Sequence, residues 1–337
     1  AANQQNLIVR VVEAYLGVLR AADNLEASRA QERAFERQLE QTRQRFEVGL
    51  IAITDVYEAQ AAYDLAQVTR IRDENALDVA RERLSVLTGK RHDNLEVLAE
   101  AFEPKKPDPI ERDAWVEFAL ENNFNLQAAQ YAEEAARQNA KARKLAHAPT
   151  VSGTAQYSES ETTGSRFQDP AGIFNFPPDQ ERDLTAFGIE VNLPLYSGGA
   201  VSANRRRAAQ EFIAARENRI NLSRNTVTEA RSLHLTVLSD VAQVAARKQS
   251  IVSSKSALDA TQAGYEVGTR NVVDVLNAQN TLFAAQRDYA NSRYDYILNM
   301  LRLKEQAGLL SPEDVYRLDS SLVEPPPPTA SEDAGEE

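Results

Sequence analysis

The 337-residue sequence has no cysteine, one methionine and one tryptophan, and only 13 glycines and 13 prolines. The lack of cysteine excludes disulfides, thiol catalysis and cysteine metal sites. Scarce glycine and proline beside abundant Ala, Gln, Glu, Arg and Leu are typical of long helices. No apolar run reaches the ~18 residues of a membrane-spanning helix. The composition therefore predicts a helical protein without a transmembrane helix.

Positive charge is also in deficit, since the formal net charge is −12, and nucleic acid is not an expected partner. The one dense basic run, the three arginines 205–207, is interpreted as a solvated helix face. The histidines His92, His147 and His234 lie far apart, and no phosphate-binding loop, Ser-His-Asp set or metal-ligand spacing occurs. The sequence thus predicts no catalytic residue, no metal site and no cofactor.

A repeated segment is the strongest positive signal. Residues 46–89 align without a gap on residues 265–308 at a constant offset of 219, with 12 identities in 44 pairs. Nine identities fall in the first 22 pairs, around a helix break, whereas generic helical composition would spread them evenly. This pattern predicts one helical hairpin used twice, with the two copies side by side.

Heptad spacing predicts the helices on both sides of each break. From Leu7 to Leu39, apolar residues recur in steps of four and three, which is the mark of a coiled-coil seam. Further helices are expected over 54–87, with Gly89 as its C-cap, over 110–146, over 200–264 and from the second break to about Gln306. The helix 200–264, roughly 95 Å long, is too long for a globular core and would span a gap or form a wall.

Two alternating segments, 150–159 and 184–196, predict a β-hairpin with one apolar and one polar face. Their lengths fit the ~9–11 residues of a tilted transmembrane strand, although a soluble hairpin capping a helical bundle remains an alternative. Between them lies a Gly-, Pro- and Asp-rich loop with Phe167, Phe174 and Phe176.

These features resemble the TolC-type outer-membrane efflux proteins. The resemblance rests on VNLPLYSGG (191–199) entering a very long helix, on AGYEVGTRNVVDVLNAQNTLFAAQ (263–286) and on its earlier copy QRFEVGLIAITDVYEAQAAYDLAQ (44–67). It implies a mainly α fold with a β-hairpin: long antiparallel coiled-coil helices form a trimeric α-barrel in the periplasm, and strands contribute to an outer-membrane β-barrel. The implied function is a passive exit duct for efflux or type I secretion, linked by a periplasmic adaptor to an inner-membrane pump.

The resemblance also implies roles for the helix breaks. A gate would join Thr54 and Asp55 of the first copy to Tyr265 and Arg270 of the second. Asp274 would form a carboxylate ring at the narrowest point, and Asn277 stands where a second aspartate would strengthen it. The turns would contact the adaptor through Val48, Gly49, Leu50, Val267, Gly268 and Thr269.

Structural explanations for the same residues stay open. Glycine permits a tight reversal between two helices, which could alone account for Gly49 and Gly268. An acidic residue in a first helical turn favours the helix dipole, which could account for Asp55 and Asp274.

The implied organisation has seven parts: a first-repeat hairpin (1–89), an equatorial connection around the middle of the barrel (90–109), a barrel helix (110–148), a β-hairpin (149–197), the second-repeat helices (198–308), a second equatorial segment (309–322) and a disordered tail (323–337). The resemblance implies two strand pairs per protomer, and this sequence shows one, so we interpret it as an N-terminally truncated member. A periplasmic coiled-coil adaptor or scaffold is the rival interpretation, which the alternating strands and the repeat disfavour.

Overall fold

The computed structural model describes residues 2–92, 94–162 and 180–324. The Phe-containing loop predicted between the strands and the predicted disordered tail beyond residue 324 lie outside these residues. The elements are α1 (Ala2–Glu47), α2 (Ile53–Thr88), β1 (Val97–Leu98), α3 (Arg112–Asn122), α4 (Phe124–Lys144), β2 (Thr150–Thr162), β3 (Gln180–Asn192), α5 (Ala200–Glu266), α6 (Val272–Gln306), α7 (Pro312–Asp319) and β4 (Leu322–Val323). None of these described helices is long and apolar enough to cross a membrane.

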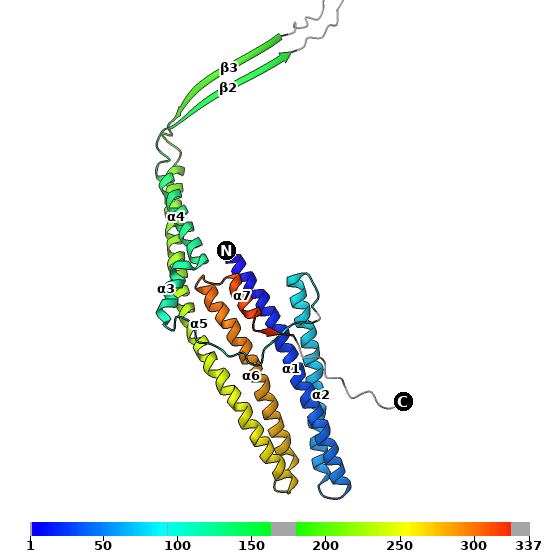
Figure 1. Ribbon diagram of the computed structural model, residues 1–337. Helices are drawn as coiled ribbons and strands as arrows, with labels where there is room; N and C mark the ends of the chain where they lie inside the picture. The colour runs from blue at the N-terminus through cyan, green and yellow to red at the C-terminus, as the bar shows by residue number, and fades with distance from the viewer. Residues whose placement is uncertain (1, 93, 163–179, 325–337) are drawn as a thin grey trace, which may run out of the picture. The chain divides into compact units, whose positions relative to one another are not determined.

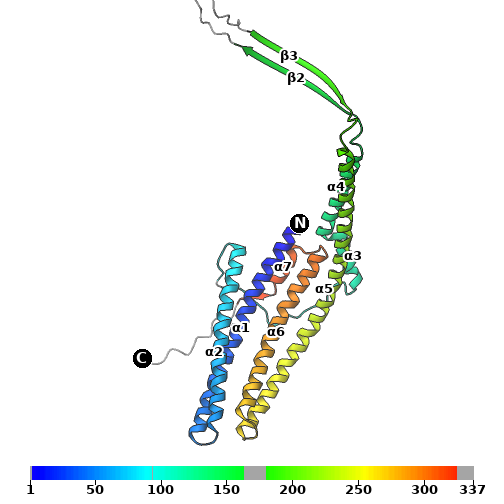
Figure 2. The same cartoon turned by 180° about the vertical axis from the view of Figure 1, so that it is seen from behind.

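The chain divides into two compact units, Ala1–Ala128 with Asn221–Glu337 and Ala129–Ile220. In the first unit the two predicted hairpins, α1–α2 and α5–α6, lie side by side in both views (Figures 1 and 2). The apolar heptad positions pack as expected: Val18 and Leu25 of α1 are buried against Leu77 and Leu84 of α2. The other side of α1 packs on α6, so that α1 has a partner on two faces.

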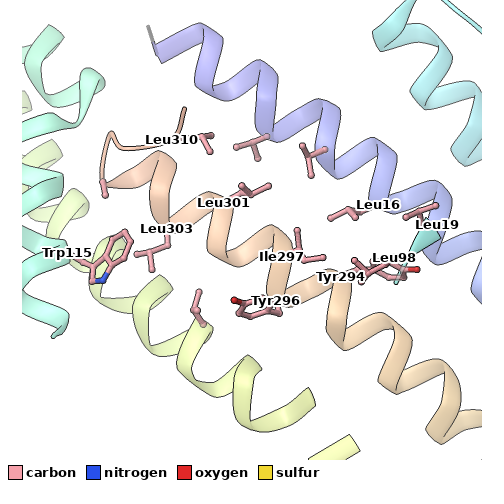
Figure 3. Packing of buried hydrophobic residues seen from close by; sticks show 14 residues of the cluster. Leu16, Leu19, Leu98, Trp115, Tyr294, Tyr296, Ile297, Leu301, Leu303 and Leu310 are labelled. Carbon is pink, nitrogen blue, oxygen red and sulfur yellow. The ribbon is translucent and has the colours of Figure 1, made fainter. Parts of the chain in front are cut away.

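The largest core cluster of this unit lies where α1, α5 and α6 meet, away from the two turns (Figure 3). Leu16 and Leu19 of α1 face Tyr294, Ile297 and Leu301 of α6, and Trp115 of α3 closes one end beside Leu303. At roughly 1.5–3 kcal/mol for each fully buried large apolar side chain, this cluster is a major source of the unit's stability.

The predicted equatorial connection is held against this core by side chains that bind its backbone. Tyr296 Oη donates to Lys105 O (2.8 Å) and accepts from Lys105 N (2.9 Å), while Tyr15 Oη donates to Glu96 O (2.7 Å). Within it β1 pairs antiparallel with β4, which joins Val97 to Val323. This pairing joins the connection to the C-terminal segment, and it places Val323 in a strand rather than in the predicted disordered tail 323–337.

The single helix predicted over 110–146 is wrong, because the structure breaks it at Asn123. This residue is extended (φ −64°, ψ 114°) and buried, and it separates α3 from α4. Its Nδ2 donates to Gln306 O (2.9 Å), and its Oδ1 accepts from Leu126 N (3.0 Å). One side chain thus caps the new helix and fixes the break to the end of α6.

The second unit contains the predicted hairpin. Strands β2 and β3 pair antiparallel from Thr150 opposite Asn192 to Thr162 opposite Gln180. Val151 stands opposite Val191, Gly153 opposite Ile189 and Ala155 opposite Phe187, so that one apolar face results, as the alternation predicts. The second strand lies earlier than predicted: it starts at Gln180 and ends at Asn192, before Pro194 removes a backbone donor.

Candidate functional site

The turns of the two hairpins share one backbone geometry. Gly49 N donates to Phe46 O (2.8 Å) and Leu50 N to Arg45 O (2.9 Å). At the same offset of 219 residues, Gly268 N donates to Tyr265 O (3.1 Å) and Thr269 N to Gly264 O (2.8 Å). Both central glycines are left-handed, with φ of +74° and +80°. The repeat is therefore structural, and glycine at the reversal has a conformational cause.

The helix start that follows differs between the two copies. Asn271, the N-cap of α6, accepts from Asp274 N (2.8 Å), and Asn271 N donates to Asp274 Oδ2 (3.5 Å), which makes a capping box. The equivalent N-cap of α2 is Ala52, which has no capping side chain. Both aspartates lie in the first turn of their helix, where the dipole favours a negative charge, but only Asp274 also belongs to a capping box.

Asp55 and Arg270, the charged residues of the predicted gate, form no ion pair with each other within one protomer. Arg270 Nη1 lies 3.7 Å from Asp274 Oδ2, in a pair whose arginine side chain is 61% exposed. Among the described residues Asp55 forms no ion pair, and Thr54 beside it is exposed. One protomer therefore contains no bond from Thr54 or Asp55 to Tyr265 or Arg270.

Tyr265 is the buried member of the set, at 5% exposure. It packs with Val272, Val275 and Leu276 of α6 and with Phe35 and Leu39 of α1, in a cluster that ties the two hairpins together near their turns. Its hydroxyl is buried and has no hydrogen-bond partner among the described residues. An unpaired buried hydroxyl costs about 1–3 kcal/mol.

Arg45 is a functional candidate that the sequence analysis missed. Its guanidinium lies 4.4 Å from the centre of the Tyr265 ring, and its Nη1 is 3.5 Å from Tyr265 O. It thereby links the first hairpin to the second. The signal in the sequence is the repeat itself, because the position equivalent to Arg45 is Gly264 and the two copies differ there.

A glycine is needed at position 264 for a local reason. A Cβ there would come 2.8 Å from Arg270 Cγ and 3.2 Å from Thr269 Oγ1. The carbonyl of the same residue accepts from Thr269 N, Arg270 N and Thr269 Oγ1. The turn of the second copy therefore folds back closely on α5 and sets the direction of Arg270.

The remaining predicted site residues are on the surface of one protomer. Val48, Leu50 and Val267 are 70%, 68% and 76% exposed, which leaves apolar side chains at both turns. Asn277 is also exposed and lies one turn after Asp274 on α6. The turns therefore present apolar tips, with polar groups on the helix starts behind them.

A polar link joins α1 to α6 between the turns and the apolar core. Tyr294 Oη donates to Asp23 Oδ2 (2.6 Å), and Arg20 pairs with Asp295. Burial raises the pKa of Asp23, and the hydrogen bond from Tyr294 offsets part of this rise. Burial and the neighbouring Asp23 carboxylate raise the pKa of Tyr294. Together with the hydrogen bond from Gln31 Nε2 to Asn280 Oδ1 (2.7 Å), these polar contacts fix the register of the two helices.

No described side chains suggest a reaction centre. Nowhere in residues 2–92, 94–162 and 180–324 do three or more His, Asp or Glu side chains gather in a way that could hold a metal ion. His234 is buried and donates from Nε2 to Ile110 O (2.8 Å), and His92 Nε2 lies 2.9 Å from Thr88 Oγ1. Both histidines therefore have a polar contact within the fold.

Comparison with known proteins decides the family. Residues 1–90 and 115–309 match the family described as Outer membrane efflux protein. The outer membrane protein TolC of Vibrio cholerae serotype O1 is 36% identical over 322 residues, which cover 96% of this chain and 72% of TolC. The chain belongs to this family. The rival interpretation of a periplasmic adaptor is therefore set aside.

Other relatives and a solved structure agree. TolC of Escherichia coli K12 is 37% identical over 96% of this chain and 65% of its own length. The alkaline protease secretion protein AprF of Pseudomonas aeruginosa is 29% identical over 95% of this chain and 65% of AprF. The crystal structure of VceC from Vibrio cholerae has a TM-score of 0.74 at 19% identity, over 90% of this chain and 70% of VceC.

These findings confirm the predicted fold class and place the family protein in the outer membrane, with helices that extend into the periplasm. The family includes efflux and protease-secretion proteins. This membership indicates that the chain belongs to an outer-membrane exit duct. The chain spans about two thirds of the length of these relatives, between 65% and 72%.

Proposed function

We propose that three copies of the protein form the wall of a passive exit duct, and that the two turns of each copy close its periplasmic end. The duct carries out no covalent chemistry. An inner-membrane pump drives transport, and a periplasmic adaptor connects the pump to the turns. The observation that carries this proposal is the unequal state of the two repeated aspartates, one committed within the protomer and one not.

The gate follows from that inequality. Asp274 is engaged by the capping box and by Arg270, whereas Asp55 has no partner among the described residues. Arg270 is largely exposed and its contact to Asp274 is long, so it is able to exchange partners. In the closed trimer Arg270 and the buried hydroxyl of Tyr265 bond to Asp55 and Thr54. Each such bond is worth about 1–3 kcal/mol when it is partly buried.

The constriction is formed by the start of α6. Three-fold symmetry would bring three Asp274 carboxylates together, where like charges raise one another's pKa and attract cations. Asn277, one turn further on, contributes no charge. The constriction is therefore less negative than one with two acidic rings, and its block by multivalent cations is correspondingly weaker.

The edges of the first unit support assembly. Within that unit the outer face of α2 exposes Leu65, Val68, Val79 and Val86, and α5 exposes Leu235 and Val252. On α2, Leu65, Val79 and Val86 are separated by multiples of seven residues and Val68 follows Leu65 by three; the 17 residues between Leu235 and Val252 on α5 also fit an a/d spacing, so each edge is an unpartnered seam. A neighbouring copy that brings its α5 edge against α2 closes both seams. The exposed tips Val48, Leu50 and Val267 remain for the adaptor.

The gate is tested by the double variant Asp55→Ala with Arg270→Ala in the assembled trimer. Because of the three-fold symmetry, the double variant removes the link from all three copies at once. The heptad seams that hold the helices together lie elsewhere. We expect single-channel conductance in planar bilayers to rise severalfold, with the helical circular-dichroism signal unchanged. The control is Asp78→Ala with Arg81→Ala, which removes an exposed pair of the same charges from the C-terminal third of α2, far from the turn.

Two outcomes would contradict the proposal. If the double variant and the control conduct alike at the same salt, the links do not hold the gate. If light scattering in detergent shows that the purified protein is a monomer, the proposed trimeric wall is wrong.

A further inference from the structure

A group of basic side chains lies where the helices of the second unit adjoin the β-hairpin. These residues occupy the last turns of α4 and the first turns of α5, and we name them the basic collar: Arg137, Lys141, Arg143, Lys144, Arg205, Arg206 and Arg207. All are exposed. No acidic residue occurs in 135–148 or in 197–210. In a chain of net charge −12, this is a marked local excess of positive charge.

The two halves of the collar lie at the same level. Helices α4 and α5 run antiparallel, with Arg219 of α5 paired to Glu133 of α4, and short segments connect them to β2 and β3 (Figure 1). At 1.5 Å per residue, Arg137 lies about 10 Å before the end of α4, and Arg207 about 10 Å after the start of α5. Both halves therefore lie within about 10 Å of the helix ends that lead into the hairpin.

Helix energetics do not explain the collar. Lys141, Arg143 and Lys144 suit a helix C-terminus, because its dipole favours cations. The three arginines 205–207 lie near the N-terminus of α5, where the dipole does not favour them, and the first turn of α5 has no acidic residue.

Ion pairing accounts for little of this charge. Arg207 is 3.6 Å from Glu211 and Arg137 pairs with Glu134. The other five form no ion pair with any described carboxylate. Their neighbours instead add like charges, which makes the collar electrostatically unfavourable unless an external anion is present.

The segment between the hairpin and the collar identifies that anion. Beyond the apolar strand face with Phe187 and Ile189, the chain continues through Leu195 and Tyr196, which are 88% and 90% exposed. Apolar side chains, then an exposed tyrosine, then cations is the order expected from a hydrocarbon layer through the interface to the headgroups. The headgroup layers add roughly 5–8 Å on each side of the hydrocarbon core, and the collar residues nearest the hairpin are Lys144 on α4 and Arg205 on α5.

We infer that the basic collar binds the headgroups of anionic phospholipids in the leaflet of the outer membrane that faces the periplasm. The inference rests on the hairpin lying in that membrane, as family membership indicates. Arginine and lysine near an anionic lipid surface gain attraction that falls off within a Debye length, so the contact orients the hairpin at its periplasmic edge. The ligand is the lipid phosphate rather than a free anion, because the adjoining apolar residues need hydrocarbon.

The test measures which lipids the detergent-solubilised protein retains. The protein is incubated with equal amounts of phosphatidylglycerol and phosphatidylcholine of the same acyl chains, and the retained lipids are counted by native mass spectrometry. We expect a preference of about tenfold for phosphatidylglycerol, which declines as salt is raised. The variant Lys141→Gln, Lys144→Gln, Arg205→Gln, Arg206→Gln should lose the preference.

Three comparison variants keep the test decisive. The same four-charge loss away from the collar, Arg33→Gln, Arg37→Gln, Lys248→Gln and Lys255→Gln, should keep the preference. If the collar variant fails to fold, Arg205→Lys with Arg206→Lys should fold and keep it, because lysine retains the charge. The gate variant Asp55→Ala with Arg270→Ala should keep it as well, so that the gate and the collar can fail separately.

Three results would overturn the inference. They are a wild type without preference between the two lipids, a distant four-charge variant that loses the preference as fully as the collar variant, and displacement of the bound lipid by inorganic phosphate. The last result would make the collar a general anion site rather than a membrane contact.

Discussion

The two helix turns have the same backbone but different side-chain chemistry. Both reverse at a left-handed glycine with hydrogen bonds in equivalent positions. After the second turn, the capping box of Asn271 and Asp274 satisfies backbone N–H groups at the start of α6. After the first turn, Ala52 stands at the equivalent position and has no capping side chain. At another equivalent pair, Phe46 is 39% exposed and Tyr265 is 5% exposed.

This difference teaches that the repeated backbone and the divergent side chains have separate roles. The shared hydrogen bonds and glycines make a reversal, which any helical hairpin requires. The differences leave Asp55 in the first copy without an ion pair and the Tyr265 hydroxyl in the second without a hydrogen bond, among the described residues. Substitutions that make one copy resemble the other can therefore separate folding from gating.

The largest effect on stability is expected at the shared glycines. Gly49→Ala or Gly268→Ala should each cost about 1–2 kcal/mol, because an L-residue is strained in the left-handed region. No atom lies within 4 Å of the added Cβ at either site, so the cost is in the backbone alone. Urea denaturation followed by far-UV circular dichroism measures it.

Gly17→Ala is the matched control for these substitutions. Its site in the middle of α1 also has nothing within 4 Å of the added Cβ, and its φ is not positive. This variant should be more stable than the wild type by up to about 1 kcal/mol, since alanine is the better helix former. Equal effects at all three glycines would show that the turn geometry is not what requires glycine.

The next effect concerns the caps that distinguish the copies. Asn271→Ala should cost about 1 kcal/mol, because it removes the acceptor for Asp274 N. Ala52→Asn should gain a similar amount, since it builds the missing cap at the start of α2. The same denaturation experiment applies. Opposite signs sharpen the comparison, whereas a loss of stability in both variants would mean that the start of α2 does not accept a cap.

The sequence could predict what the local chain determines. The repeat located both turns, the positive-φ glycines and the ends of α2 and α6, because these depend on residues close in sequence. The alternation predicted the apolar face of the hairpin, but it continued through Leu193 and Leu195 across Pro194, so that the end of β3 was placed too late.

Contacts between distant residues determined the rest. No glycine or proline marks the break at Asn123, which depends on Gln306 O, 183 residues away. The contact of Arg45 with Tyr265 joins positions 220 residues apart, and nothing in either local sequence pairs them. The absence of a cap at Ala52 could be read from the sequence, but its consequence for Asp55 required the capping box of the second copy as a comparison.

A smaller effect is expected from the link between the copies. Arg45→Gln should cost about 0.5–1 kcal/mol, because it removes a cation–π contact at a partly exposed site. Arg33→Gln, an exposed arginine on the same helix, should change the unfolding free energy by much less. Thermal unfolding of the two variants in detergent would measure the difference, and equal shifts would mean that the stacking on Tyr265 contributes nothing.

The smallest effect on stability, and the most informative for function, is expected from Tyr265→Phe. This variant introduces the residue type that the first copy has at the equivalent position, Phe46. Within one protomer the Tyr265 hydroxyl is buried without a partner among the described residues. Its removal should therefore leave the free energy of unfolding unchanged or raise it slightly, since no bond is lost and a desolvated group disappears.

Conductance of the same variant responds to the assembled gate. If assembly gives the Tyr265 hydroxyl a partner in Thr54 or Asp55, the variant loses three bonds per trimer, and the open state should become more populated in planar bilayers. Phe46→Tyr is the reciprocal variant; it adds a hydroxyl at a partly exposed site and should leave conductance at the wild-type value. A Tyr265→Phe channel that stays as closed as the wild type would remove this tyrosine from the gate and leave the closure to Arg270 and Asp55.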